Sequence, residues 1–217
     1  MAFFRCLVFA PFYDMNMFPT PALFDGYTFV LASQSPRRKE LLELLNIPVK
    51  VWNKPIDEVY PPELMPEQVP IYLAELKSKA FDQEPLGQKE ILITADTVVI
   101  CEETILNKPK NREEAIACLR KISDNRHRVI TGCCIGLNHR RQTFNVVTDV
   151  YFKPLSEEEI IYYVDYYNPY DKAGAYGVQE WIGCIGVERI EGSFYNVVGL
   201  PLQRLYSEVC KMLQSQS

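Results

Sequence analysis

Two hydroxyl groups and two guanidinium groups stand together where an apolar segment of the sequence, residues 27–32, gives way to a leucine-rich one. This cluster consists of Ser33, Ser35, Arg37 and Arg38. Ser35 suits the N-cap of a helix and Pro36 its first position, where the absent N–H costs nothing. Free backbone N–H groups, hydroxyls and guanidiniums at a helix start would bind a phosphate or polyphosphate. The alternative is an ordinary helix cap followed by two solvated arginines.

An aspartate interrupts a nearly continuous apolar segment, "ILITADTVVI", at residues 91–100. Such a segment is typical of a central strand. Burying a carboxylate in it costs free energy unless the charge is paired or bound to a metal. We therefore interpret Asp96, at a strand end with the hydroxyl of Thr97 beside it, as a general base or a metal ligand. The alternative is an aspartate that caps a turn between two strands.

Further charged residues could complete such a site. Asp57 and Glu58 follow a predicted strand, and paired carboxylates near Asp96 would bind a hard divalent cation such as Mg²⁺. Lys79 on a predicted helix and Lys108 after a strand could each neutralise phosphate oxygens as point charges. Taken one at a time, these residues are equally typical of a solvated surface.

A late segment, "DKAGAYGVQEW", combines closely spaced glycines with a glutamine. Gly174 and Gly177, with Gly192 downstream, are typical of tight backbone near a ligand. Gln179 offers both a donor and an acceptor, so its side chain could hydrogen-bond the edge of a base. The alternative is a set of turn glycines and a surface glutamine.

Alternating strand and helix signals place these residues in one α/β domain with a mixed sheet. We expect strands at residues 27–32, 49–52, 91–100, 127–137 and 141–152. We expect helices at residues 36–45, 66–81, 111–122 and 156–167 and from residue 201 onward. Asn111 is a plausible N-cap, and Ser156 with Glu159 is predicted to form a capping box. Residues 1–26 are predicted to form an amino-terminal extension, and residues 27–217 the domain.

Composition excludes several classes of protein. The net charge of −5 argues against a nucleic-acid-binding face. No apolar run approaches the roughly 20 residues that span a bilayer. The seven cysteines lack a CxxC spacing and are typical of reduced thiols in a cytoplasmic protein. A catalytic cysteine paired with His127 remains an alternative, although no neighbouring motif supports it.

In their order along the chain, these motifs resemble those of the Maf family of nucleoside triphosphate pyrophosphatases. The matching segments are Ser33 to Leu45, Asp57-Glu58, Lys79-Ala80, Ala95 to Thr97, Lys108-Pro109, Asp171 to Gln179 and Asn196 to Pro201. The resemblance implies an α/β fold like that of Maf and inosine triphosphatase proteins, with an elongated mixed β-sheet flanked by helices and two lobes around a nucleotide cleft. It also implies hydrolysis of a nucleoside triphosphate to the monophosphate and pyrophosphate.

The resemblance extends to one branch of the family. An arginine directly after Ser-Pro, here Arg37, resembles the branch that acts on dTTP and UTP, and Thr97 and Gln179 also match it. Members that prefer 7-methyl-GTP tend to carry an aromatic residue at that position. The chain departs from the family after Gln179, where Glu180 and Trp181 replace the usual glycine.

The expected reaction is attack of water on the α-phosphorus, with Asp96 as general base or metal ligand and Glu58 sharing a divalent cation, Mg²⁺, Mn²⁺ or Co²⁺. The resemblance assigns substrate binding to Ser33, Ser35, Arg37, Arg38, Lys79, Thr97, Lys108 and Gln179. A nucleotide-binding regulator of cell division with little catalysis and a pyrophosphatase preferring 7-methyl-GTP are the alternatives. Five tyrosines between residues 162 and 170 are expected to pack internally or to form the contact of a homodimer.

Overall fold

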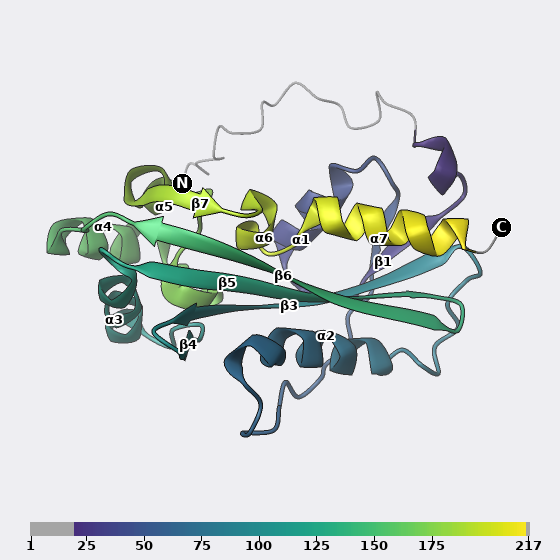
Figure 1. Cartoon of the computed structure of the whole chain (residues 1–217), viewed down its shortest axis with the longest axis horizontal. Coiled ribbons are helices and arrows are strands. Elements are labelled where there is room, and N and C mark those ends of the chain that lie inside the picture. Colours follow the sequence, from purple (N-terminus) through teal and green to yellow (C-terminus); the bar gives the residue numbers. More distant parts are fainter. Residues whose placement is uncertain (1–19, 216–217) are drawn as a thin grey trace.

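The computed structural model describes residues 20–215, which form an elongated mixed sheet covered by helices (Figure 1). The strands are β1 (Thr28–Leu31), β2 (Val49–Val51), β3 (Glu90–Cys101), β4 (Thr104–Leu106), β5 (Arg126–Leu137), β6 (Arg140–Phe152) and β7 (Val187–Glu191). Their order is β2-β1-β3-β5-β6-β7, with β4 paired to β3. Strand β1 runs parallel to β2 and β3, whereas the other pairings are antiparallel. The predicted α/β fold with a mixed sheet is confirmed.

Several helices begin at residues whose side chains cap them. They are α1 (Pro36–Glu43), α2 (Val69–Lys79), α3 (Arg112–Ile122), α4 (Glu157–Tyr167), α5 (Trp181–Gly186), α6 (Phe194–Val198) and α7 (Leu202–Gln214), with 3-10 turns η2 (Ala22–Phe24), η3 (Pro66–Gln68), η4 (Pro169–Asp171) and η5 (Ala173–Ala175). Ser35 caps α1 and Asn111 caps α3 through their side chains. Ser156 and Glu159 form the predicted capping box of α4.

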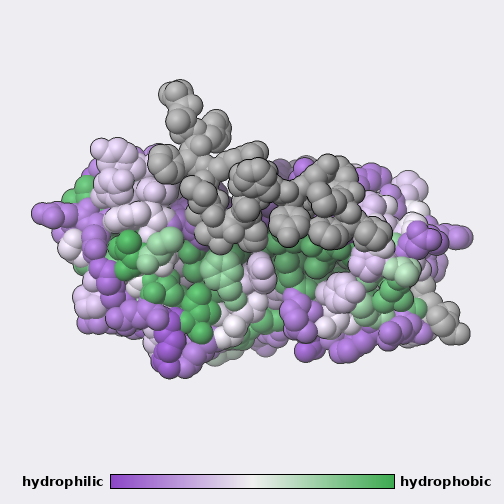
Figure 2. Space-filling view, turned by 90° about the horizontal axis from the view of Figure 1, so that it is seen from above, coloured by the Kyte–Doolittle hydropathy of each residue, from purple (hydrophilic) through white to green (hydrophobic). Residues whose placement is uncertain are grey.

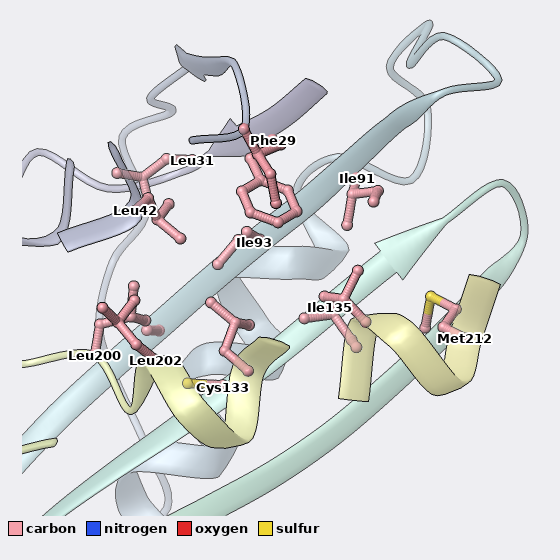
Figure 3. Packing of buried hydrophobic residues seen from close by; sticks show 14 of the residues in the cluster. Phe29, Leu31, Leu42, Ile91, Ile93, Cys133, Ile135, Leu200, Leu202 and Met212 are labelled. Atoms are coloured by element: carbon pink, nitrogen blue, oxygen red, sulfur yellow. The ribbon is translucent and has the colours of Figure 1, made fainter. Parts of the chain in front are cut away.

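Two hydrophobic clusters lie at opposite ends of the long sheet. Side chains of β1, β3 and β5 meet α1 and α7 in the first cluster, part of which is shown in Figure 3. The second cluster lies under α3, α4 and α5, around the fully buried Leu119 and Tyr163. Each cluster is the core of one of the predicted lobes, and strands β3 and β5 contribute to both.

The predicted amino-terminal extension is described only from residue 20 onward, so residues 1–19 lie outside the described part of the chain. Phe24, within the same predicted extension, is fully buried. Its ring packs edge-on against Phe29 at a centroid distance of 6.1 Å and lies 5.3 Å from the ring of Tyr206. Phe24 therefore contributes to the domain core, and the division of the chain at residue 26 stays a prediction.

The described surface is mainly hydrophilic at both ends of the molecule, with hydrophobic residues gathered nearer the middle of the face shown in Figure 2. Exposed hydrophobic side chains include Val59 and Tyr166. Within residues 20–215, no helix combines the length and the apolar character needed to cross a bilayer.

A buried histidine gives the fold a pH dependence. His127 is 1% exposed, and its Nε2 lies 2.7 Å from the hydroxyl of Tyr176. Burial lowers the pKa of His127 to about 4, from 6.5 in an ordinary environment. As the pH falls, His127 therefore becomes protonated in the unfolded chain before it becomes protonated in the folded protein. We expect the free energy of unfolding to drop by about 3 kcal/mol between pH 6.5 and pH 4 through this residue.

Urea unfolding at pH 7.0 and pH 4.5 measures this contribution. The substitution His127→Leu removes the titrating group and keeps an apolar side chain of similar volume in the core. The variant should be less stable at neutral pH but should lose less stability than the wild type on acidification. An identical pH dependence in the two proteins would contradict the assignment to His127.

Candidate active site

A cleft of about 590 Å³ lies along the middle of β3. Its walls come from the start of α1, the loop after β2, α2, β3, β5 and the turns before α5. All but one of the predicted site residues line it, namely Ser33, Ser35, Arg37, Arg38, Glu58, Asp96, Thr97, Lys108 and Gln179. Lys79 is the exception. Segments far apart in the sequence thus contribute polar side chains to one cavity.

Asp96 lies within strand β3 and not at a strand end, so this part of the prediction was wrong. In the sheet, Asp96 pairs with Gly132 on the neighbouring strand β5. The strand continues through the carboxylate because Lys77 neutralises it, with the Lys77 Nζ 2.6 Å from Asp96 Oδ1. The same ammonium lies 2.9 Å from Glu58 Oε1. One lysine therefore holds two of the predicted carboxylates together.

Close packing of α2 on β5 places Lys77 over Asp96. A Cβ added at Gly132 would lie 2.3 Å from the backbone nitrogen of Ile71 and 2.4 Å from the carbonyl of Pro70. Only glycine permits this approach of the helix to the strand, because any side chain would push α2 away. Gly132 is therefore required for the geometry of the ion pair, although it carries no functional group.

The lysine of α2 that lies in the cleft is Lys77 and not the predicted Lys79. Lys77 lines the cleft, whereas the side chain of Lys79 is exposed on another face of the helix. Residues two apart on a helix point in different directions, and Lys77 follows the buried Leu73 by four residues. This spacing was available in the sequence and identifies Lys77 as the lysine on the packed face.

Arg38 connects three elements through its guanidinium group. Its Nη1 donates to the carbonyl of Ala95 at 2.8 Å, and its Nη2 donates to Thr97 Oγ1 at 3.0 Å. Its Nε donates to the carbonyl of Gly199 at 2.9 Å, and Ser33 Oγ lies 3.3 Å from its Nη1. Burial lowers the pKa of Arg38 and the charge of Asp96 opposes this effect. Arg38 therefore holds the walls of the cleft together, and its contact with substrate stays a prediction.

Arg37 is less enclosed than Arg38 and has a different partner. Its Nη1 donates to Asp171 Oδ2 at 2.6 Å, and its side chain is 25% exposed. Burial tends to raise the pKa of Asp171, but hydrogen bonds and charges from Lys172 and Arg37 lower it to about 2. Asp171 and Lys172 also line the cleft, and the sequence reasoning had not assigned them to the site.

The donor set of the cleft fits a divalent cation that is shared with a substrate. Asp96 and Glu58 both face Lys77, so their carboxylates lie close together. Burial tends to raise the pKa of Glu58, but the hydrogen bond and charge of Lys77 hold it below its usual value. Within residues 20–215, no group of three or more acidic, histidine or cysteine ligands surrounds one point. Mg²⁺ often takes one or two carboxylates together with substrate phosphates.

The remaining predicted residues lie at other positions around the cleft. Lys108 is exposed in the loop after β4. Thr97 Oγ1 lies 2.9 Å from the hydroxyl of Thr131 on β5. Gln179 lies in the turn before α5, next to the lining residue Gly177. Cations, carboxylates and the amide of Gln179 thus line the same cleft.

A polar cleft with these two kinds of group on a mixed α/β sheet defines a nucleotide-binding protein with the charges for phosphate chemistry. The chain matches the Maf-like protein family over residues 28–212 and belongs to this family. The predicted resemblance is thereby confirmed.

Curated relatives cover most of the chain. A dTTP/UTP pyrophosphatase of Bacteroides fragilis is 51% identical over 186 residues, which are 85% of this chain and 96% of that protein. One from Porphyromonas gingivalis is 52% identical over 185 residues, 84% of this chain and 93% of that protein. One from Cytophaga hutchinsonii is 44% identical over 187 residues, 86% of this chain and 85% of that protein.

Proposed function

We propose that this protein hydrolyses dTTP and UTP to the nucleoside monophosphate and pyrophosphate. The observation that carries the proposal is the cleft itself, where the carboxylates of Asp96 and Glu58 lie beside Arg37, Lys77 and Lys108. A site that only bound an anion would have little use for two carboxylates among its cations. The relatives named dTTP/UTP pyrophosphatase support the same activity.

The reaction needs positioning and charge stabilisation and no covalent nucleophile. Arg37, Lys108 and the N–H groups at the start of α1 bind the triphosphate and stabilise the negative charge of the leaving pyrophosphate. Asp96 orients a water molecule toward the α-phosphorus and accepts its proton. Asp96 and Glu58 would hold a divalent cation, Mg²⁺, Mn²⁺ or Co²⁺, which supplies further positive charge to the phosphate oxygens.

Product analysis tests the activity. The protein is incubated with ordinary and modified nucleoside triphosphates plus Mg²⁺, and pyrophosphate and orthophosphate are assayed separately. We expect pyrophosphate and the monophosphate, and a loss of turnover when EDTA removes the cation. Orthophosphate release would mean attack at the γ-phosphorus, and tight binding without turnover would support a nucleotide-binding regulator instead.

Gln179 is the proposed reader of the base. Its amide can pair with both O4 and N3–H of uracil or thymine, and Arg37 offers no aromatic face for a cationic methylated guanine. Replacing Gln179 by leucine should raise the KM for UTP and dTTP by about tenfold or more, because a site built to hydrogen-bond a base loses its partner. Steady-state pyrophosphate release measures the change.

Comparison with 7-methyl-GTP is the control for this base assignment. Trp181 follows Gln179 closely in the sequence, but it does not line the cleft, and its ring lies 4.9 Å from that of Tyr162. A higher kcat/KM for 7-methyl-GTP than for UTP would contradict the assignment of pyrimidine preference. It would leave the pyrophosphatase activity unaffected.

The cellular setting is also part of the proposal. The cysteines within residues 20–215 are all unpaired, which supports a cytoplasmic location. Tyr162 and Tyr166 of α4 are exposed, whereas Tyr163 is fully buried, so the tyrosines of this helix do not form one surface. A homodimer stays a prediction that sedimentation measurements can test.

A further inference from the structure

The turn that carries Gln179 is closed by a backbone hydrogen bond from the N–H of Glu180 to the carbonyl of Gly177, 3.0 Å long. A Cβ added at Gly177 would lie 2.7 Å from Glu180 Cδ, so the glycine leaves room for this carboxylate. Glu180 is the N-cap residue of α5, yet its side chain makes no cap hydrogen bond. The Glu180 side chain instead folds back over the turn.

One hydroxyl group binds both ends of this turn. The Tyr163 hydroxyl accepts a hydrogen bond from the N–H of Gly177 at 3.0 Å and donates one to Glu180 Oε2. Tyr163 belongs to α4, is fully buried, and stacks on Tyr167 with ring centroids 5.0 Å apart. Burial and the neighbouring Glu180 carboxylate raise the pKa of Tyr163, so the hydroxyl keeps the proton that it donates.

The second oxygen of Glu180 extends the connection toward the phosphate side of the cleft. Glu180 Oε1 lies 3.1 Å from the ammonium of Lys172, which is 8% exposed. Lys172 Nζ lies 2.7 Å from Asp171 Oδ1, and Asp171 Oδ2 lies 2.6 Å from Arg37 Nη1. A chain of hydrogen bonds and ion pairs thus runs from Tyr163 to Arg37 and connects the Gln179 turn to the start of α1.

We infer that Tyr163 and Glu180 are positioning residues that hold the turn of Gln179 at a fixed place relative to Arg37. The base and the triphosphate of one substrate are then bound together by groups whose separation the hydrogen-bond chain determines. The inference rests on the proposed reading of the base by Gln179. Asp96 lines the cleft, whereas Tyr163 and Glu180 do not. Loss of Tyr163 or Glu180 should therefore affect discrimination between bases more than the chemical step.

The substitution Tyr163→Phe tests the inference because it removes the hydroxyl and keeps the buried ring. Affinities for UTP and GTP are measured calorimetrically without divalent ions, so that turnover does not interfere. The UTP preference should fall about tenfold, and the kcat for UTP with Mg²⁺ should change less than about threefold. Tyr166→Phe, which removes the hydroxyl of a largely exposed tyrosine on the same helix, should change neither quantity.

A double-mutant cycle separates positioning from a general loss of packing. In a Gln179→Leu background, Tyr163→Phe should cause little further loss of UTP preference, because the residue being positioned is gone. Fully additive losses, an unchanged preference in Tyr163→Phe, or equal affinity of the wild type for UTP and GTP would each overturn the inference.

A second variant covers the case in which Tyr163→Phe does not fold, which circular dichroism would reveal. Glu180→Gln keeps the size of the side chain and removes the negative charge that pairs with Lys172. It should lower the UTP preference at least threefold, and an unchanged preference would overturn the inference. Failure of the proposed function can be distinguished from failure of this inference. If the proposed function is wrong, the wild type releases no pyrophosphate, whereas the binding measurements of the double-mutant cycle need no turnover.

Discussion

Replacing Asp96 by asparagine should lower the kcat for pyrophosphate release from UTP by about a thousandfold, within the range of general base catalysis. The substitution removes a charge and almost no volume. The amide oxygen can still accept a hydrogen bond from Lys77, which also keeps Glu58 as a partner at 2.9 Å. The melting temperature and the affinity for UTP without divalent ions should therefore stay close to those of the wild type.

Asp165→Asn is the matched control for this experiment. Asp165 accepts a hydrogen bond from Arg112 Nε at 2.6 Å and does not line the cleft, so the same change removes an ion pair outside the site. Its kcat should equal that of the wild type. If Asp96→Asn kept more than about a tenth of the wild-type kcat, Asp96 would be neither the base nor an essential metal ligand.

The substitution Arg38→Met should cost both stability and activity. It leaves the carbonyls of Ala95 and Gly199 without their donor, and each lost partner of an enclosed polar group costs about 1–3 kcal/mol. We expect the free energy of unfolding to fall by about 3 kcal/mol. Activity should fall at least about a hundredfold, because the start of α1 and strand β3 lose their connection.

Arg37→Met provides the comparison, because it is the same substitution one residue earlier. Arg37 pairs with Asp171, whose side chain is 58% exposed. The free energy of unfolding should change by less than about 1 kcal/mol, as for other exposed ion pairs. Binding of the triphosphate should weaken by about 1.5–3 kcal/mol through loss of a charge-assisted contact. Urea unfolding measures the change in stability, and UTP calorimetry measures the change in binding. Equal losses of unfolding free energy in Arg38→Met and Arg37→Met would contradict the different structural roles given to the two arginines.

Features set by neighbouring residues were predictable from the sequence. Ser35, Asn111 and Ser156 cap their helices as predicted, because an N-cap hydrogen bond joins residues only two or three positions apart. The alternation of apolar segments likewise predicted most of the strands, and the family motifs predicted most of the residues that line the cleft.

Features set by packing between distant segments were not predictable in this way. The position of Asp96 inside a strand depends on neutralisation by Lys77, and that contact depends on the packing of α2 against Gly132. Arg37 and Asp171 meet although they are 134 residues apart in the sequence. Local patterns contain no information about such pairings, so the ion pairs of Lys77 with Asp96 and of Arg37 with Asp171 appeared only in the structure.

Asp96 lies in the middle of β3, and β1 and β5 are among the neighbours of that strand. This location also affects how the cleft responds to a ligand. Backbone amides in central strands open to solvent only when the whole domain unfolds, whereas helix starts and loops open far more easily. Asp96, the proposed general base, is therefore held in place for as long as the domain stays folded. Residues 53–58, which lie in the loop after β2, are therefore expected to adapt to different nucleotides more easily than Asp96 moves.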